Sequence, residues 1–511
     1  MTIFDEITNR AAGSDGEYLC DESRLSGGNA VRIFFPENAL QTSQIVKYCN
    51  QEIIPFTVYG KGTGITGGAV PFGGFVISIE KMKNSGAVSF DKDAKKFFLK
   101  VDAGVTLNDI KEFLHRKEYF DMTGYELFYP VDPTEMGASI GGTVATNASG
   151  ASSFRYGPTR NWIKSLEIIL PDGEIAVIKR GEQFADDNGS MEINGKHFLI
   201  PDIKMPECKN AAGLYSRKNM DLIDIFIGSE GILGIVTGVE IWLERKYPSF
   251  SMIKFLKNEH KALEFVKMLK KNKELDPVFI EYVDERGLEM LRKKRNRDRS
   301  SINIPEIEPE FKTAVFFDIA LDKLGVAEVS DIVDEIEEKL NVRDAFSWCA
   351  WEEIEIERIR AFRHALPETV NTYISEIKKI YPEIHKLGTD LAVPDENFEM
   401  MTAFYHDILD RSGLNYVVFG HIGNNHLHIN IIPENVEDLK KGFEIYKKLA
   451  GYAVELKGTV SAEHGIGKIK HRYLVEMYGE NGISEMKRVK FFFDPGYLLN
   501  RNNMFEYMEM K

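Results

Sequence analysis

The 511-residue sequence predicts an α+β protein with two domains and a helical C-terminal segment. Up to residue 246, after a helical lead-in, short helical and strand patterns alternate around three glycine-rich clusters. From 247 to 468, amphipathic helices such as 260–275 alternate with apolar strands such as 313–321, which is typical of an antiparallel sheet covered by helices. Residues 469–511 predict a largely helical ending.

The composition is that of a globular protein and argues against several functions. Hydrophobic residues make up 43% and charged residues 28%. The net charge of −15 repels phosphate backbones, so nucleic-acid binding is not expected. The four cysteines lie far apart and form no CxxC, which argues against an iron–sulfur or zinc-thiolate site and favours a reducing compartment. No apolar run has membrane-spanning length and no secretion signal is evident, so we expect a cytoplasmic protein without a transmembrane segment.

Local patterns place the elements of the first domain. Residues 41–50 predict a helix, and 53–60 predict the strand that follows it. Pro171-Asp172-Gly173 separates two apolar runs and predicts a hairpin turn. Residues 181–209 are polar and without a period, so we expect an irregular surface excursion. Residues 221–246 predict two apolar strands around a tight turn.

One strong block of basic charge lies in the second domain, at residues 292–299. Such a run is usually a solvated face or loop. The alternative is a docking patch for an acidic redox partner.

The first glycine cluster, residues 60–68, follows a predicted strand. Glycines there let the backbone approach an anion and direct several N–H groups at it, although a plain turn would need no ligand. A dinucleotide-binding turn of the Rossmann type requires a helix that begins inside the glycine loop. Because Gly67, Gly68 and Pro71 prevent such a helix, the cluster is predicted to be a loop between strands.

Two further clusters have the same character. Residues 130–150 are small, polar and glycine-rich, which indicates either close approach to a bulky ligand or tight helix–sheet packing. Residues 228–234 are again glycine-rich and lie between apolar runs.

In this order, the three clusters resemble the flavin-binding half of the vanillyl-alcohol-oxidase-type flavoproteins, and within them the D-2-hydroxy acid dehydrogenases. That branch includes flavoenzymes that oxidise D-lactate, glycolate and D-2-hydroxyglutarate. The resemblance extends from about Asp21 to Asn500. It implies a two-subdomain PCMH-type FAD-binding domain over 1–246, a ferredoxin-like substrate (cap) domain over 247–468, and a segment 469–511 that returns to the first domain.

The resemblance also implies which residues contact FAD. A histidine often stands at the position of Thr63 in relatives that bind FAD covalently, so a non-covalent cofactor is expected here. The implied FAD-binding residues are Gly60, Lys61, Gly62, Thr63, Gly64, Gly67, Gly68, Pro133, Ser139, Gly141, Gly142, Thr146, Asn147, Gly228, Glu230, Gly231, Gly234, Ile235 and Asn500.

Histidines concentrate in the segment 420–430. From His426 onward a strand pattern places His426, His428 and Asn430 on one face, and His421 precedes the turn. With a carboxylate such as Glu463, such histidines suit a divalent metal with open coordination positions. Spacing alone more often indicates core histidines that are satisfied by hydrogen bonds.

The family motifs favour the metal. The segment resembles G-H-x-G-D-G-N-L-H, and 458–467 resembles G-x-x-S-x-E-H-G-I-G. That match implies His421, His428 and Glu463 as ligands of Zn, Mn or Fe, with His464 as the catalytic base. Where the family has Asp-Gly-Asn, this chain has Asn424-Asn425-His426, so His426 either adds a ligand or alters substrate choice.

The substrate carboxylate calls for a cation. Arg363 lies where the family places its carboxylate-binding arginine, with Arg358 and Arg360 as rivals and a solvated helix arginine as the plain alternative. Lys386 and Asp390 fall in a segment where relatives carry a substrate-contacting lysine.

The resemblance therefore predicts FAD-dependent oxidation of a D-2-hydroxy acid to the 2-oxo acid. Alternatives are other chemistry on the same fold, as in alcohol oxidases or ether-lipid-forming alkylglycerone-phosphate synthases, and a non-catalytic flavin relay subunit. Electrons are expected to pass to an electron-transfer flavoprotein, a cytochrome, an iron–sulfur subunit or a quinone. Binding to such a redox partner could hold the protein at a membrane surface. A homodimer is a candidate oligomeric state.

Overall fold

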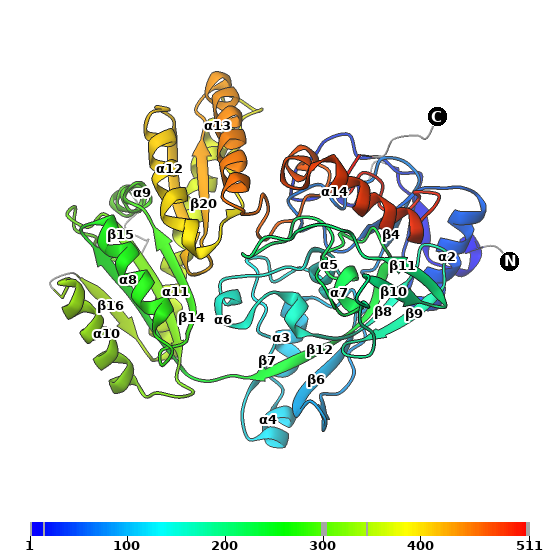
Figure 1. The fold of residues 1–511 in the computed structure, drawn as a ribbon, viewed down its shortest axis with the longest axis horizontal. Coiled ribbons are helices and arrows are strands. Elements are labelled where there is room, and N and C mark those ends of the chain that lie inside the picture. Colours follow the sequence, from blue (N-terminus) through cyan, green and yellow to red (C-terminus); the bar gives the residue numbers. More distant parts are fainter. Residues whose placement is uncertain (1–2, 14–15, 298–303, 344–345, 507–511) are drawn as a thin grey trace.

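The computed structural model describes residues 3–13, 16–297, 304–343 and 346–506. Figure 1 shows two parts side by side, one containing both chain ends and one formed by the green-to-orange middle of the chain. The long strand β12 (Ile235–Arg245) runs from the first part toward the second, where β13 (Ser249–Leu256) begins.

A four-stranded sheet forms the N-terminal subdomain, in the order β1-β2-β4-β3. The strands are β1 (Asn9–Ala11), β2 (Arg32–Phe34), β3 (Phe56–Tyr59) and β4 (Phe75–Ser78), of which β2, β4 and β3 run parallel. Helix α2 (Ala39–Gln51) connects β2 to β3, and its N-cap Asn38 accepts a hydrogen bond from the Gln41 N–H. The parallel order leaves the loop after β3 at the carboxyl edge of the sheet, where ligands usually bind in open α/β sheets.

An antiparallel sheet forms the second subdomain, in the order β5-β6-β12-β8-β9, with β7 also paired to β12. The predicted turn at 171–173 joins β8 to β9. The strands are β5 (Ser89–Asp91), β6 (Lys96–Asp102), β7 (Leu127–Phe128), β8 (Ile163–Ile169) and β9 (Ile175–Lys179). The accompanying helices are α3 (Leu107–Leu114), α4 (Lys117–Thr123), α5 (Ile140–Thr146), α6 (Ser153–Tyr156) and α7 (Ile223–Phe226).

Two local predictions in this subdomain are wrong. The segment 181–209 contains a hairpin of β10 (Ser190–Ile193) and β11 (Lys196–Leu199). The first of the two strands expected within 221–246 is instead the helix α7. Every residue of α7 is buried, and a short apolar run buried on all sides has no period that separates a helix from a strand.

The second part is an antiparallel sheet with helices, as predicted. Its strand order is β16-β13-β15-β14-β19-β20-β17, with β18 also paired to β20. Together with the two subdomains of the first part, this sheet confirms the predicted α+β class. The remaining strands are β14 (Pro277–Val283), β15 (Thr313–Ala320), β16 (Ser347–Ala350), β17 (Leu387–Gly388), β18 (Leu391–Ala392), β19 (Asn415–His421) and β20 (His426–Ile432). The helices are α8 (Glu259–Lys271), α9 (Glu285–Arg297), α10 (Val326–Leu340), α11 (Glu353–Lys378), α12 (Phe398–Asp410) and α13 (Val436–Glu455).

The basic run 292–299 is only partly an open surface. Arg292 donates from its guanidinium to the carbonyls of Ile307 and Phe311, and Arg295 donates to that of Ile304. These arginines hold the chain that leads to β15, while residues 298 and 299 lie outside the described part. The docking role remains a prediction.

The chain returns to the first part at its end. Helix α14 (His471–Phe493) bends at Gly479, and the residues after it run parallel to the edge strand β3. The Phe56 N–H donates to Leu498 O at 2.8 Å, and the Asn500 N–H donates to Phe56 O at 2.8 Å. The residues beside the first glycine loop are thus contributed by opposite ends of the sequence. The domain limits at 246 and 468 remain predictions.

Candidate active site

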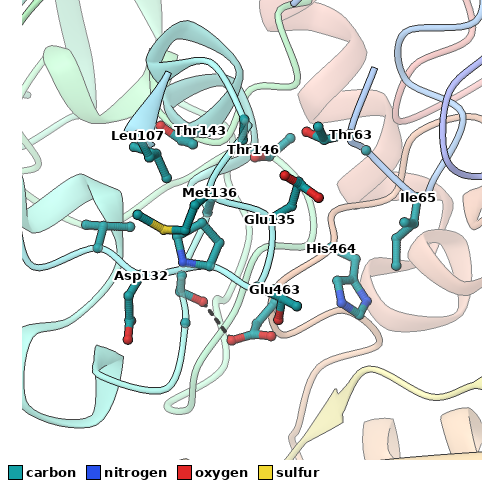
Figure 2. Close-up of a pocket in the computed structure, with 18 of the residues that line it drawn as sticks. Thr63, Ile65, Leu107, Asp132, Glu135, Met136, Thr143, Thr146, Glu463 and His464 are labelled. Atoms are coloured by element: carbon teal, nitrogen blue, oxygen red, sulfur yellow. Dashed lines mark hydrogen bonds between the residues drawn. The ribbon is translucent and has the colours of Figure 1, made fainter. Parts of the chain in front are cut away.

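A cavity of about 2650 Å³ is lined by residues of both parts. The first part contributes the loop after β3 and the residues around α5. The second part contributes α11, β14, β19 and β20, and residues 463–473 complete the wall. In Figure 2, Glu463 and His464 project toward it from one segment, opposite residues of the first part such as Asp132 and Met136.

The first glycine loop presents free backbone donors to this cavity. None of the N–H groups of residues 61–68 donates a hydrogen bond to another described residue. Gly62 has φ +66°, and a Cβ there would lie 2.1 Å from the Tyr59 hydroxyl oxygen, so only glycine fits. A turn of unpaired N–H groups is an anion-binding concavity, which suits the pyrophosphate of FAD. The loop therefore fits the cofactor that the sequence predicts.

The second cluster packs directly against this loop. Ser139 caps α5 by accepting from the Gly142 N–H, and a Cβ at Gly60 would lie 2.6 Å from the Ser139 hydroxyl oxygen. Thr143 and Thr146 lie on the same side of the cavity as Thr63 in Figure 2. Small residues in this cluster thus serve both close packing and the cavity wall.

The third cluster connects three separate segments. The Glu230 carboxylate accepts from the N–H groups of Ile466 and Gly467 at 2.6 and 2.7 Å. Asn500 accepts from the Val58 N–H at 2.8 Å and donates to the Gly231 carbonyl at 2.9 Å. The side chains of Glu230 and Asn500 are therefore engaged by the protein itself, although both residues also border the cavity.

Most of the sequence-predicted cofactor residues line the cavity, but three do not. Gly67 accepts from Lys468 through its carbonyl, Asn147 accepts from the Arg160 N–H, and the Gly228 N–H donates to Val144. The residues that line it are Gly60, Lys61, Gly62, Thr63, Gly64, Gly68, Pro133, Ser139, Gly141, Gly142, Thr146, Glu230, Gly231, Gly234, Ile235 and Asn500.

At the cap side of the cavity, three histidines and a glutamate converge. One ring nitrogen each of His421, His426 and His428 and one carboxylate oxygen of Glu463 lie within 4.8 Å of one another. The alternation of β20 brings His426 and His428 to this place, and the turn before β20 folds His421 back opposite His426. His421, His428 and Glu463 border the cavity, whereas the ring of His426 is fully buried behind it.

Acceptors outside the cluster orient two of these rings. His421 Nδ1 lies 2.6 Å from a carboxylate oxygen of Glu281, and His428 Nδ1 lies 3.1 Å from the Thr389 carbonyl. Their Nε2 atoms therefore face Glu463, at 3.4 and 3.9 Å. Proteins orient metal-binding histidines in this way, with an oxygen acceptor hydrogen-bonded to the ring nitrogen that does not bind the metal.

Glu463 is also bound by cationic and neutral donors. Lys209 makes an ion pair with it, and the Ser149 hydroxyl donates to it at 3.0 Å. Burial alone would raise the pKa of Glu463, but the charges of Lys209 and His421 hold it well below its usual value. The ammonium neutralises part of this carboxylate and leaves the second oxygen toward His428. The donor set of imidazoles and an ionised carboxylate fits a divalent transition metal.

The imidazoles differ in their readiness to carry a proton. Burial lowers the pKa of His426 to about 4. For His421, burial also acts downward, but the carboxylates of Glu463 and Glu281 raise the pKa to about 9. Burial also lowers the pKa of His428, so the lone pairs of His426 and His428 are available at neutral pH, and that of His421 only when a cation displaces its proton.

Asp390 is the buried centre of the neighbouring network. Its Oδ2 lies 3.2 Å from His464 Nδ1 and 3.0 Å from Lys470 Nζ, and its Oδ1 lies 3.2 Å from His426 Nε2. Burial would raise the pKa of this carboxyl, but the neighbouring His464 imidazole and Lys470 ammonium hold it well below its usual value. His464 is held at Nδ1, so its Nε2 is the nitrogen left for the cavity.

The guanidinium of Arg363 is already bound to a carboxylate of the protein, so it is not fully free to bind that of a substrate. Its Nε and Nη2 donate to the two oxygens of Glu281 at 2.9 and 3.2 Å. Arg358 and Arg360 pair with glutamates of their own helix. Lys386 borders the cavity, and no ion pair joins it to another described residue.

Sequence reasoning assigned no role to Asp390 and missed Glu281 and Lys209. Glu281 had a visible signal, since it is a lone charge inside the apolar strand β14. Lys209 had no such signal, because it lies in a polar loop and only folding brings it to the distant Glu463.

Two family models match the chain, the FAD binding domain over residues 30–179 and the C-terminal domain of FAD linked oxidases over residues 250–504. Together they span most of the chain, which belongs to the FAD-linked oxidases and is an enzyme with FAD as its cofactor. The resemblance predicted from the glycine clusters and histidine motifs is confirmed.

Individual proteins agree with this assignment. The chain is 27% identical over 511 residues to D-lactate dehydrogenase of Anaerostipes hadrus, covering 98% of this chain and 93% of that protein. It is 26% identical over 478 residues to glycolate oxidase subunit GlcD of Bacillus subtilis (strain 168), covering 93% and 88%. A solved structure of 4-ethylphenol oxidase from Gulosibacter chungangensis, in complex with isoeugenol, shares the fold with a TM-score of 0.64 and 15% identity, covering 98% and 94%.

Among the described helices, none combines the length and apolar character that crossing a bilayer requires.

Proposed function

We propose that the protein oxidises a D-2-hydroxy acid to the 2-oxo acid with FAD, and that His464 is the base. The observation that carries the proposal is the pairing of a cavity-facing imidazole with a buried carboxylate, beside a cluster of metal-donor side chains. The names of the relatives support the substrate class, since they include a D-lactate dehydrogenase and a glycolate oxidase subunit.

The proton and the hydride of the substrate leave in different directions. His464 takes the hydroxyl proton at Nε2, because Nδ1 faces the Asp390 carboxylate. The C–H bond at the α carbon breaks with both electrons while the carbonyl forms. FAD held by the residues that line the cavity would supply the two-electron acceptor for that hydride. The residues proposed to hold FAD are those implied from sequence, with the N–H groups of residues 61–68 on the pyrophosphate.

His421, His428 and Glu463 are the proposed ligands of a divalent metal. Such an ion, when bound, supplies Lewis acidity to the substrate oxygens and lowers the pKa of the hydroxyl. Glu281 and the Thr389 carbonyl fix the histidine rings, and Lys209 moderates the charge of Glu463. The protein's contribution is to hold the donors in place before substrate arrives.

Lys386 and Arg363 are proposed to receive the substrate carboxylate. Lys386 is the better placed, since it has no anionic partner among the described residues. Burial and the nearby Arg24 lower its pKa, so a bound carboxylate would stabilise its ammonium form. Arg363 offers only the edge that Glu281 leaves free, so its main effect is to position Glu281 behind His421.

The four cysteines are free, so no disulfide is available to take electrons from the flavin. We propose that an external acceptor does so, as expected from sequence, and that FAD is held without a covalent bond at Thr63.

The test is an anaerobic titration of the purified holoenzyme with paired D- and L-2-hydroxy acids, followed through the flavin absorption band. Bleaching by a D-acid and not by its L-partner is expected. A yellow protein that no acid bleaches contradicts the proposal and favours other chemistry or a relay role. Release of all FAD by acid precipitation tests the non-covalent attachment.

A further inference from the structure

His426 is an unusual residue for its position. Of the three positions where this chain departs from the family motif, two have evident local partners. Asn425 adopts φ +54°, which asparagine tolerates where the motif has glycine, and it bonds with Lys270 and Asp395. Asn424 lies beside the Ser153 hydroxyl at 3.5 Å. Only His426 turns toward the histidine cluster.

The imidazole of His426 is buried without being satisfied. Its side chain has no exposed area, and neither ring nitrogen makes a hydrogen bond to a described residue. Asp390 Oδ1 is 3.2 Å from Nε2, but the pair lacks hydrogen-bond geometry. A buried polar group without a partner is costly, so this arrangement calls for a ligand that the ring can bind.

The surroundings of the ring match those of its two neighbours. Its centroid lies 4.4 Å from that of His428 and 5.3 Å from that of His421. Each of those rings has one nitrogen held from behind by an oxygen, and the other nitrogen faces Glu463. In His426 the Asp390 carboxylate stands behind Nε2, which leaves Nδ1 without a protein partner. His426 thus has an oxygen beside one nitrogen, as its two neighbours do, but no hydrogen bond fixes its ring, so a metal ion at Nδ1 would be the partner that it lacks.

We propose that His426 is a fourth protein ligand of the divalent metal, so that the site is His421, His426, His428 and Glu463. This inference rests on the metal site of the proposed function and extends it. A site with three imidazoles favours a late first-row ion such as Zn²⁺, Fe²⁺ or Co²⁺ over Mg²⁺ or Ca²⁺. An ion that accepts six ligands keeps two positions for the hydroxyl and carboxylate oxygens of a 2-hydroxy acid.

The test uses the FAD-loaded enzyme, stripped of metal by a chelator and titrated with Co²⁺ against a chromophoric chelator. His426→Asn is the informative variant, because asparagine is the residue of the family motif. His406→Asn is its matched control, since His406 pairs with Glu259 and is not a member of the cluster. We expect His426→Asn to bind Co²⁺ at least about tenfold more weakly, with unchanged flavin absorption, and the control to match the parent.

X-ray absorption of the Co²⁺-loaded parent gives a result that needs no variant. Three imidazole ligands are expected in the parent and two in His426→Asn. Two imidazoles in the parent, or equal Co²⁺ affinity in the parent and His426→Asn, overturn the inference and leave a three-residue site. A parent that binds no Co²⁺ also overturns it. Bleaching of its flavin by a D-2-hydroxy acid in the same preparation would still uphold the oxidation itself.

Discussion

Asp390 Oδ2 lies 3.2 Å from His464 Nδ1, and the Asp390 side chain is completely buried. The same carboxylate accepts from the backbone N–H of His464 at 3.0 Å and from the Ser461 hydroxyl at 2.5 Å. An ionised, immobile acceptor at Nδ1 selects the tautomer whose Nε2 carries a lone pair. Asp390 is therefore a positioning residue for the proposed base.

Replacing Asp390 by asparagine should remove this selection. An amide can donate to Nδ1 and stabilise the wrong tautomer, so kcat for flavin reduction should fall by at least about a hundredfold, while KM changes little. The measurement is stopped-flow reduction of the flavin by the substrate. Asp331→Asn is the control, because it makes the same change at an exposed aspartate of α10 and should keep the parental kcat. Parental kcat in Asp390→Asn, at parental FAD content, would falsify the positioning role.

Gly467 sets the distance between the C-terminal motif and the first glycine loop. It has φ +52°, and a Cβ there would lie 2.1 Å from the Thr66 carbonyl oxygen. Gly467→Ala should therefore push the glycine loop out of place and weaken FAD binding by tenfold or more, on the order of 1.4 kcal/mol. Fluorescence titration of the apoprotein with FAD measures this.

Gly413→Ala is the matched control for that variant. Gly413 has φ +68°, and a Cβ there would meet no atom within 4 Å, so the variant carries the same backbone strain without the clash. Equal FAD affinity in the two variants would contradict the role assigned to the contact between position 467 and Thr66.

Lys386 should control substrate affinity more than turnover. It is one of several cations that border the cavity without an ion pair to another described residue, and burial lowers its pKa. Lys386→Met should raise KM for the acid about tenfold or more, because a hydrogen bond to a charged group contributes about 1.5–3 kcal/mol. Lys379→Met changes an exposed lysine paired with Glu376 and should leave KM unchanged. If both variants keep the parental KM, the carboxylate is bound elsewhere.

The sequence predicted those parts of the site whose conformation depends only on neighbouring residues along the chain. Gly67, Gly68 and Pro71 forbid a helix after β3, and the structure has a loop there. Alternation predicted that His426 and His428 share one face of a strand, and both lie in β20 within the cluster. These patterns depend only on steric freedom and side-chain period.

The remaining parts of the site depend on contacts between distant segments. Lys209 reaches Glu463 across 254 positions, and Asp390 reaches Lys470 across 80. No periodicity encodes such pairs, and the bidentate pairing of Arg363 with Glu281 is of the same kind. The helix α7 was not predicted, because the surrounding fold buries it on all sides and its sequence then has no amphipathic pattern.

Asp284 should make stability fall as pH rises. It is buried at the start of α9, where it accepts from the Gly287 N–H at 2.8 Å. Burial raises its pKa to about 7, with Glu259 adding to the shift and Arg286 opposing it. In the unfolded chain an aspartate titrates near 3.9, so folding takes up a proton between these values. That stabilisation is complete below about pH 4 and is lost as pH rises through about 7.

Asp284→Asn keeps an oxygen for the Gly287 N–H and cannot ionise. The parent should therefore lose about 2–4 kcal/mol relative to this variant between pH 4 and pH 8. Thermal unfolding of both proteins at pH 5 and pH 8 measures the difference, and the variant should gain on the parent at the higher pH. Asp331→Asn replaces an exposed aspartate of α10 and should track the parent at both values. A gap between parent and Asp284→Asn that is the same at pH 5 and pH 8 would mean that Asp284 is already ionised in the fold, held so by the N–H groups at the start of α9.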